Sequence, residues 1–272
     1  MKQILHVAKK EFKDGLRNRW LVSITLIFAV LALGISYFGA ASSGTIGLTS
    51  MSTTLASLSS LAVFLIPLIA LLVSYDSFVG ERESGTLLLL LTYPISKTQL
   101  LIGKFVGQGS IIALAIILGF GSAAVLLAIQ LQDLNVITKF TRFIFSAIML
   151  GLSFTAIAHL ISLISSEKSK AAGLALITWF SYALIFDLVL LALLVSLDGG
   201  LSPKALSYAM MLNPCDSFRL VNMAGLDHSD INGSLAMVVS SSLNQWQLFI
   251  LLTAWIIAPL ALSNLVFKRI RL

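Results

Sequence analysis

The amino-acid sequence predicts an all-α membrane protein, and two observations support that fold class. Of the 272 residues, 58% are hydrophobic and only 11% are charged, whereas soluble domains carry about 25% charged residues. Apolar runs long enough to cross a bilayer recur along the chain, and a segment in lipid must satisfy its own backbone hydrogen bonds as a helix. We therefore expect a single transmembrane domain over residues 1–272.

The N-terminal segment, residues 1–19, is predicted to be an amphipathic helix lying on the membrane surface. At helical spacing, one face collects Ile4, Leu5, Ala8, Phe12 and Leu16. The opposite face collects Lys2, His6, Lys9, Lys13 and Arg17. A basic face of this kind is attracted to anionic lipids, so membrane lipids are expected partners. The alternative is a basic flank that only orients the first span.

Six apolar runs are predicted to span the membrane, each with roughly the 20 residues that a crossing needs. They cover residues 20–40, 56–75, 105–129, 143–165, 171–196 and 247–267. The sequence gives no sign of a cleaved signal, because the first run is too long for one and further spans follow.

The distribution of Lys and Arg predicts the orientation, since these residues are enriched on the cytoplasmic side. With the N-terminus inside, 14 of the 18 Lys and Arg residues fall on inner segments. The outer segments hold the other four, Lys139, Arg142, Lys204 and Arg219. Both termini are therefore predicted to be cytoplasmic.

The largest inner interruption, residues 76–104, is predicted to be a helical elbow that another protein grips. It begins with a charged stretch that includes Glu81, Arg82 and Glu83, continues with a run of leucines, and turns at Pro94. A loop that only linked two spans would not need the leucine run. The alternative is a solvated turn.

The longest outer segment, residues 197–246, is predicted to be a platform for an external partner. Ser202-Pro203 and Asn213-Pro214 each pair an N-capping residue with a proline at the first helical position. Two short helices are expected, from Pro203 to Leu212 and from Pro214 to Asn222. The alternative is a segment that merely closes the bundle.

The sequence holds no recognisable catalytic motif, so we expect a chain that is not an enzyme. It has no phosphate-binding loop, no H-E-x-x-H zinc motif and no nucleophile elbow. The net charge of +6 is explained by topology, and no nucleic-acid partner is expected. A stripe of small residues is predicted to pack helices together; its members are Gly103, Gly107, Ser110, Gly119 and Ser122.

Two sets of polar or soft side chains are candidate sites. Asp187 lies in the fifth apolar run, where a carboxylate is costly and often functional; the alternative is a structural bond to a neighbouring helix. Sulfur and imidazole groups on the outer side could suit Cu(I), but methionines at helical spacing usually fill the core. This soft set is Met210, Met211, Cys215, Met223, His228 and Met237. No metal site is predicted.

Several stretches make the chain similar to the ABC-2-type exporter permeases. The resemblance is strongest to the members that serve maturation of nitrous oxide reductase, and it extends over nearly the whole chain. The stretches are KEFKDGLRNRW (10–20), GTLLLLLTYP (85–94), LIGKFVG (101–107), EKSKAAGLAL (167–176), FDLVLLALLV (186–195) and LNPCDSFRL (212–220).

This resemblance implies a bacterial inner-membrane complex with several partners. Two copies of the permease would form the membrane core, two copies of a separate cytoplasmic ATPase would bind beneath it, and a periplasmic β-helical protein would sit above. The chain would bind no cofactor itself, with ATP and Mg on the ATPase. The purpose implied is copper-centre assembly of nitrous oxide reductase. The alternatives are an ABC-2-type permease for a drug, lipid or ion, and a stand-alone secondary transporter.

The resemblance also places the two contact regions on this sequence. ATPase coupling would use Glu81, Arg82, Glu83, Gly85, Thr86 and Pro94. Binding of the periplasmic partner would use Asn213, Pro214, Asp216, Phe218, Arg219 and Leu220.

Overall fold

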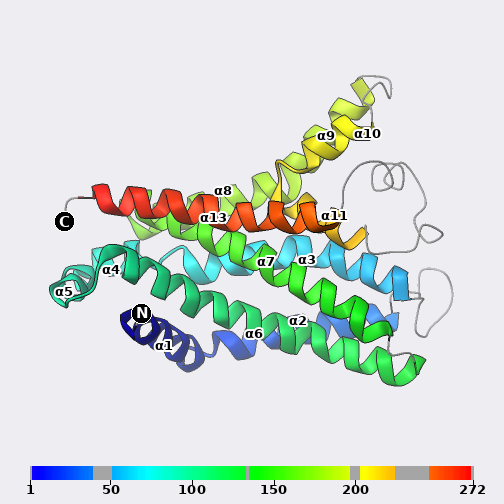
Figure 1. The fold of residues 1–272 in the computed structure, drawn as a ribbon, viewed down its shortest axis with the longest axis horizontal. Helices are drawn as coiled ribbons and strands as arrows, with labels where there is room; N and C mark the ends of the chain where they lie inside the picture. The colour runs from blue at the N-terminus through cyan, green and yellow to red at the C-terminus, as the bar shows by residue number, and fades with distance from the viewer. Residues whose placement is uncertain (1, 39–50, 133–134, 197–202, 224–244, 271–272) are drawn as a thin grey trace.

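The computed structural model describes residues 2–38, 51–132, 135–196, 203–223 and 245–270. Throughout these ranges the regular structure is helical. The long helices run side by side as an elongated bundle (Figure 1). The all-α fold predicted from the sequence is confirmed.

Six long apolar elements form the bundle. Five are single helices: α2 (Trp20–Phe38), α3 (Met51–Ser74), α6 (Lys97–Leu131), α7 (Asn135–Ile164) and α13 (Gln245–Arg269). The other is a continuous helical segment made of α8 (Lys168–Phe180), the π-helix η2 (Ser181–Ile185) and α9 (Phe186–Ser196). Within the described ranges, five of these helices are long and apolar enough to cross a membrane by themselves. A sixth span results when α2 is counted together with the helix before it.

In the described part of the chain, five shorter helices lie at the two ends of the bundle. They are α1 (Lys2–Arg17), α4 (Val79–Glu83), α5 (Thr86–Thr92), α10 (Pro203–Met210) and α11 (Pro214–Met223). α1 makes an angle of 65° with the first part of α2, the geometry expected when a surface helix turns into a span. The predicted helix starts at Pro203 and Pro214 are confirmed.

The core is built around α7, which packs against α3, α6 and α13. Large aromatic rings fill the spaces between the helices. Phe143 of α7 meets Phe120 of α6 at a ring-centroid distance of 5.1 Å and Phe218 of α11 at 5.9 Å. All three rings are fully buried, so α11 belongs to the core.

Helix α1 packs closely against the glycine stripe of α6, as predicted for helix packing. A Cβ added at Gly107 would lie 2.6 Å from Cβ of Glu11 and 2.8 Å from the carbonyl oxygen of Ala8. A Cβ at Gly103 would lie 2.6 Å from Cβ of Val7. Only glycine allows the two helices to come this close.

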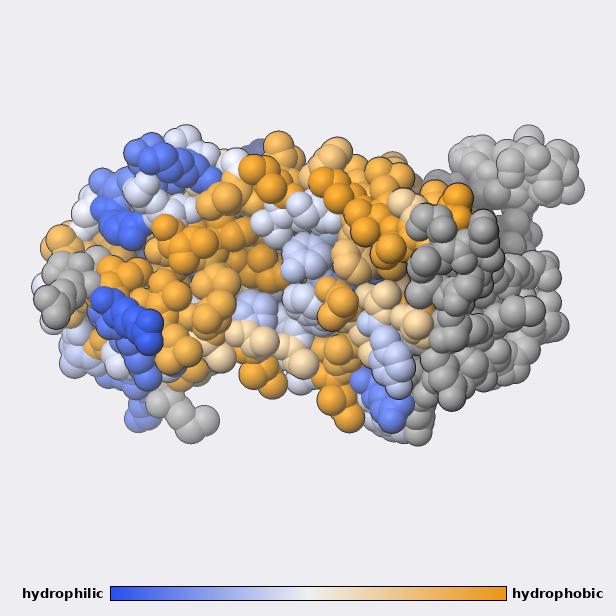
Figure 2. All heavy atoms as spheres, turned by 90° about the horizontal axis from the view of Figure 1, so that it is seen from above, coloured by the Kyte–Doolittle hydropathy of each residue, from blue (hydrophilic) through white to orange (hydrophobic). Residues whose placement is uncertain are grey.

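Both chain ends lie at the same end of the bundle as α1, α4 and α5 (Figure 1). We call this the inner end, because the Lys and Arg count predicts that it is cytoplasmic; the opposite end, near α10 and α11, is the outer end. The spans α8 to α9 and α13 leave many apolar side chains exposed, including Leu188, Leu191 and Ile250. Figure 2 shows that apolar side chains cover the middle of one face, while strongly polar ones gather near the inner end. This pattern fits a multi-pass membrane protein.

Candidate functional site

The inner elbow consists of α4 and α5, placed between the spans α3 and α6. Gly85 joins the two short helices with a φ of 73°, a left-handed conformation that glycine adopts without strain. Leu87 points into a small core with Phe78 and Phe267. The next leucines, Leu88 and Leu89, are 55% and 64% exposed. The elbow is therefore anchored by a buried side chain, Leu87, and has an apolar outer surface.

One lysine joins the elbow to two other helices. The ammonium of Lys104 on α6 donates to Oε1 of Glu81 on α4 at 2.7 Å and to Oε1 of Glu11 on α1 at 3.0 Å. The side chain of Lys104 is only 3% exposed. A buried ammonium is costly unless it is paired, so these carboxylates hold Lys104 in its position.

A chain of neutral polar groups extends this network into the bundle. Nε2 of Gln108 donates to Oε2 of Glu11 at 3.3 Å and to Oγ of Ser77 at 3.0 Å. Oε1 of Gln108 lies 2.9 Å from Nε2 of His159 on α7, whose ring is fully buried. We call Glu11, Glu81, Lys104, Gln108 and His159 the inner network.

The N-terminus of α4 is also held by α7. The hydroxyl of Ser162 accepts hydrogen bonds from the backbone N–H groups of Phe78 and Val79, at 2.9 and 3.0 Å. These donors lie at the start of α4, where helices leave N–H groups without intrahelical partners. Ser162 thus caps α4 from a neighbouring span.

The charged side chains of α4 turn toward the protein itself. Arg82 donates to the carbonyl oxygen of Ser165, and Oε1 of Glu83 accepts from the backbone N–H of Lys168 at 2.6 Å. Lys168 also forms an ion pair with Asp76. The turn between α7 and α8 is therefore fastened to the elbow through these contacts.

The predicted coupling residues consequently divide into two groups. Glu81 and Arg82 are partly buried in contacts within the chain, whereas Gly85, Thr86 and Pro94 are exposed. Glu83 is exposed as well, although it is bonded to Lys168. The surface that a partner could reach is formed by α5 and its flanks, and it is mainly apolar.

A polar cavity of about 540 Å³ lies beside the inner network. Its wall includes Lys10, Asp14, Asp76 and Lys168 in addition to network members. Both signs of charge line it, and no triplet of His, Cys, Asp or Glu within the described ranges is arranged to hold a metal ion. The arrangement suits water and mobile ion pairs between α1, α4 and α6.

At the outer end, Asp187 is paired with a neighbouring helix. One guanidinium nitrogen of Arg219 on α11 donates to Oδ2 of Asp187 at 2.7 Å and to Oδ1 of Asp216 at 2.8 Å. Asp187 therefore makes a bond to a neighbouring helix, as one of its two interpretations expected, and its role stays a prediction. Burial raises the pKa of the Asp216 carboxyl to about 6, and the charge of Arg219 opposes that shift.

The π-helix η2 ends at Ile185, shortly before Asp187 in the same continuous helical segment. Wide turns of this kind shift the helical register and often occur at functional sites. The carbonyl oxygen of Tyr182 in η2 accepts a hydrogen bond from Nδ2 of Asn213 at 2.9 Å. Asn213 also accepts from the backbone N–H of Cys215, so this residue both caps α11 and fixes the π-helix.

The residues predicted to bind the periplasmic partner are mostly inside the bundle. Asn213, Asp216, Phe218 and Leu220 are at most 2% exposed, Pro214 is buried, and Arg219 is partly buried. In this structure they stabilise the outer end and present little surface to a partner. Exposed residues beside this segment include Tyr208 of α10 and Leu212, at 61% and 66%.

The soft side chains that the structure describes lie in and around the core at the outer end. Cys215 is fully buried, and its Sγ lies 3.9 Å from the carbonyl oxygen of Val63. Burial raises the pKa of its thiol well above the usual value. Met210 is buried and Met211 packs on the same core. His228 and Met237 lie outside the described residues.

The whole-chain comparison decides the family. The family described as ABC-2 family transporter protein matches residues 5–272. The chain belongs to this family. ABC-2 permeases are membrane subunits that work with an ATPase, so membership implies such a partner.

Two relatives agree over nearly their full lengths. The chain is 49% identical to the "Probable ABC transporter permease protein NosY" of Stutzerimonas stutzeri, covering 99% of both chains. It is 48% identical to the protein of the same name from Pseudomonas aeruginosa, covering 97% of both. The predicted resemblance is confirmed, and the chain is an ABC transporter permease.

Sequence reasoning missed the inner network. Lys104 was counted as a flank of the third span, and the roles of Gln108 and His159 were overlooked. Two signals were available, because Gln108 follows Lys104 by one helical turn and His159 interrupts an apolar run. Polar residues within spans usually face the interior and pair with one another.

Proposed function

We propose that this chain is the transmembrane subunit of an ABC complex in which a separate cytoplasmic ATPase drives movement through the elbow. ATP hydrolysis would take place on that NosF-like partner, and two copies of the permease would form the membrane core. A NosD-like β-helical protein would dock at the outer end, where α10 and its flanks offer exposed side chains. The complex would serve copper-centre assembly of nitrous oxide reductase in the bacterial inner membrane.

One observation carries the coupling part of the proposal. At the inner end, the exposed side chains of Leu88, Leu89 and Tyr93 stand next to one another on and beside α5. An apolar surface at the aqueous end of a membrane protein is a typical binding site for another protein.

The contacts behind α5 explain how movement would spread. α4 is bonded to α6 through Lys104, to α7 through Ser162, and to the turn before α8 through Glu83. A push on α5 is passed to α4 across Gly85 and from there to these three elements.

The similarity to the two NosY permeases supports the copper-related role.

The proposal is tested by co-expressing the permease with its ATPase and purifying the permease from membranes. The double variant Leu88→Asp, Leu89→Asp should lose the ATPase, because a charged surface replaces the apolar one. The matched control is His6→Asp, at an exposed position on the polar face of α1, which should retain the ATPase. Retention of the ATPase by the double variant, with permease at normal levels, would refute docking at α5.

A further inference from the structure

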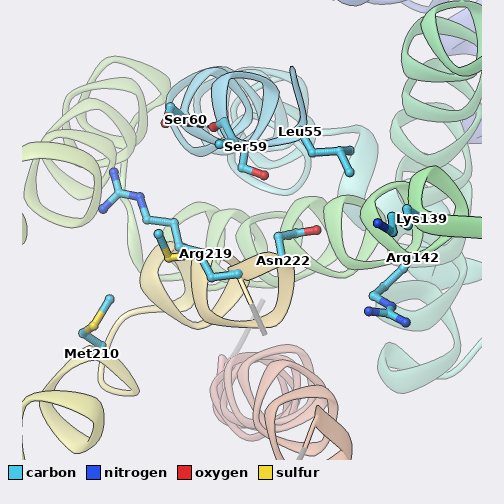
Figure 3. Close-up of a pocket in the computed structure, with 10 residues that line it drawn as sticks. Leu55, Ser59, Ser60, Lys139, Arg142, Met210, Arg219 and Asn222 are labelled. Carbon is cyan, nitrogen blue, oxygen red and sulfur yellow. Dashed lines mark hydrogen bonds between the residues drawn. The ribbon is translucent and has the colours of Figure 1, made fainter. Parts of the chain in front are cut away.

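We propose that the outer end of the bundle contains a binding site for a small anion with a short apolar part. The site is a pocket of about 250 Å³ between α3, α7, α10 and α11 (Figure 3). Its wall includes Leu55, Ser59, Lys139, Arg142, Met210 and Asn222. This inference does not rest on the proposed coupling function.

Positive charge is concentrated on one side of the pocket. Lys139 and Arg142 are three residues apart on α7, and so they lie on the same helical face. Figure 3 shows the two side chains next to each other, with Arg219 on the opposite side of the view. Within the described part of the chain, Arg142 has no ion-pair partner and the residues that line the pocket include no carboxylate.

The opposite side of the pocket is less positive. Arg219 shares its guanidinium with Asp187 and Asp216, so two carboxylates stand near that end against one cation. An anion is therefore directed to the end that holds Lys139 and Arg142.

A buried hydroxyl provides a second observation. Ser59 lines the pocket, and its Oγ is shielded from solvent and has no hydrogen-bond partner among the described residues. Buried polar atoms are nearly always bonded in folded proteins. Rotation about χ1 of Ser59 would let this hydroxyl donate to an acceptor oxygen of a bound anion.

The remaining wall determines which anion fits. Leu55, Ala56, Met210 and Met223 contribute apolar surface, and methionine adapts to irregular ligand shapes. The volume lies below the roughly 300–1,000 Å³ of drug-sized ligand sites. The ligand class is thus a phosphate, sulfonate or carboxylate attached to a short apolar body, either a phospholipid headgroup region or a soluble organic anion.

Thermal unfolding of the purified full-length chain in a neutral detergent can test the site. Three probes distinguish a phospholipid from a soluble organic anion. They are dihexanoyl phosphatidylglycerol, its phosphatidylcholine counterpart, which has no net charge, and butanesulfonate. A ligand that binds only the folded state raises the Tm. We expect a rise with phosphatidylglycerol, butanesulfonate or both, and none with phosphatidylcholine. A response to phosphatidylglycerol alone identifies a lipid, and a response to butanesulfonate identifies a soluble anion.

Variants then link the effect to the pocket. Arg142→Gln should weaken the anion roughly tenfold, since a charge-assisted hydrogen bond is lost, and Arg142→Lys should retain most of the affinity. Ala56→Phe should block binding by filling the pocket without changing its charge. Lys170→Gln, an exposed cation at the inner end of the bundle, should bind normally. No response to either anion in the wild type, or equal affinity in Arg142→Gln and the wild type, would overturn the proposal.

Discussion

Nζ of Lys104 lies 2.7 Å from Oε1 of Glu81, and this contact joins the inner elbow to the membrane bundle. The same ammonium binds Glu11 at 3.0 Å. α1, α4 and α6 therefore meet at one buried charge. Movement of any one of these helices must either carry the other two along or break an ion pair of a buried ammonium.

Lys104→Met should strongly destabilise the permease. The substitution leaves Glu11 and Glu81 with only the exposed Lys10 as a cationic neighbour, at 3.6 and 4.0 Å. Loss of one partner of a buried ion pair costs about 3–5 kcal/mol. The Tm in detergent should fall by on the order of 10 °C. Lys9→Met, at an exposed position of α1, should leave the Tm nearly unchanged.

Removal of the two carboxylates should rescue that variant. In the triple variant Lys104→Met, Glu11→Gln, Glu81→Gln, no buried charge remains uncompensated. Its Tm should recover a large part of the loss. If it unfolds no later than Lys104→Met alone, the defect comes from packing and the electrostatic explanation fails.

Two glycines of α6 should respond to alanine in opposite directions. Gly107→Ala places a methyl group 2.8 Å from the carbonyl oxygen of Ala8 and should displace α1. Gly121→Ala meets nothing within 4 Å and should stabilise the helix by up to about 1 kcal/mol. Hydrogen exchange of α1 amides measures the effect: faster exchange is expected only in Gly107→Ala. Unchanged exchange in that variant would show that α1 is not seated on the stripe.

Asp187 and Arg219 should differ in their importance. Asp187→Asn retains an acceptor oxygen for Arg219, which also remains paired with Asp216; the Tm should change little. Arg219→Met removes the cation from two carboxylates, one of them 1% exposed, and should lower the Tm by several degrees. A severe loss of maturation activity in Asp187→Asn at normal expression would instead indicate a working carboxylate.

Asp216 should make stability depend on pH. Burial raises the pKa of its carboxyl from the ordinary 3.8 to about 6 in the folded protein, so the folded state binds a proton more readily than the unfolded state does. This group therefore stabilises the fold below about pH 4 and loses that contribution as the pH rises through 6. Relative to the wild type, Asp216→Asn should show a smaller decline in Tm between pH 4 and 7. Parallel Tm profiles for the two proteins would contradict the assignment.

Much of the fold could be predicted from local patterns. The apolar runs located the spans, and Pro203 and Pro214 marked the starts of α10 and α11, because proline fits the first turn of a helix. The stripe around Gly107 indicated a close helix contact. These features depend only on residues near one another in the sequence.

The site was harder to predict, because its residues are far apart in the chain. Helix α11 resembles a surface helix, as Asp216, Arg219 and Asn222 interrupt its apolar residues. In the structure these polar groups bond to one another, to Asp187 and to Ser146, and so the helix can enter the core. The contacts of the charged residues of α4 could not be predicted for the same reason, since their partners Lys104, Ser165 and Lys168 lie elsewhere in the chain.

The central claim is that the ATPase contacts α5, and cysteine crosslinking tests it most directly. The chain has one native cysteine, Cys215, which is fully buried, so reagents should react with introduced cysteines. In membranes that contain the whole complex, Leu89→Cys should crosslink to the ATPase, with a yield that changes on adding ATP. Val125→Cys, which is 58% exposed on α6 far from the elbow, should not. Absence of the Leu89→Cys crosslink in a complex with normal ATP turnover would contradict the account.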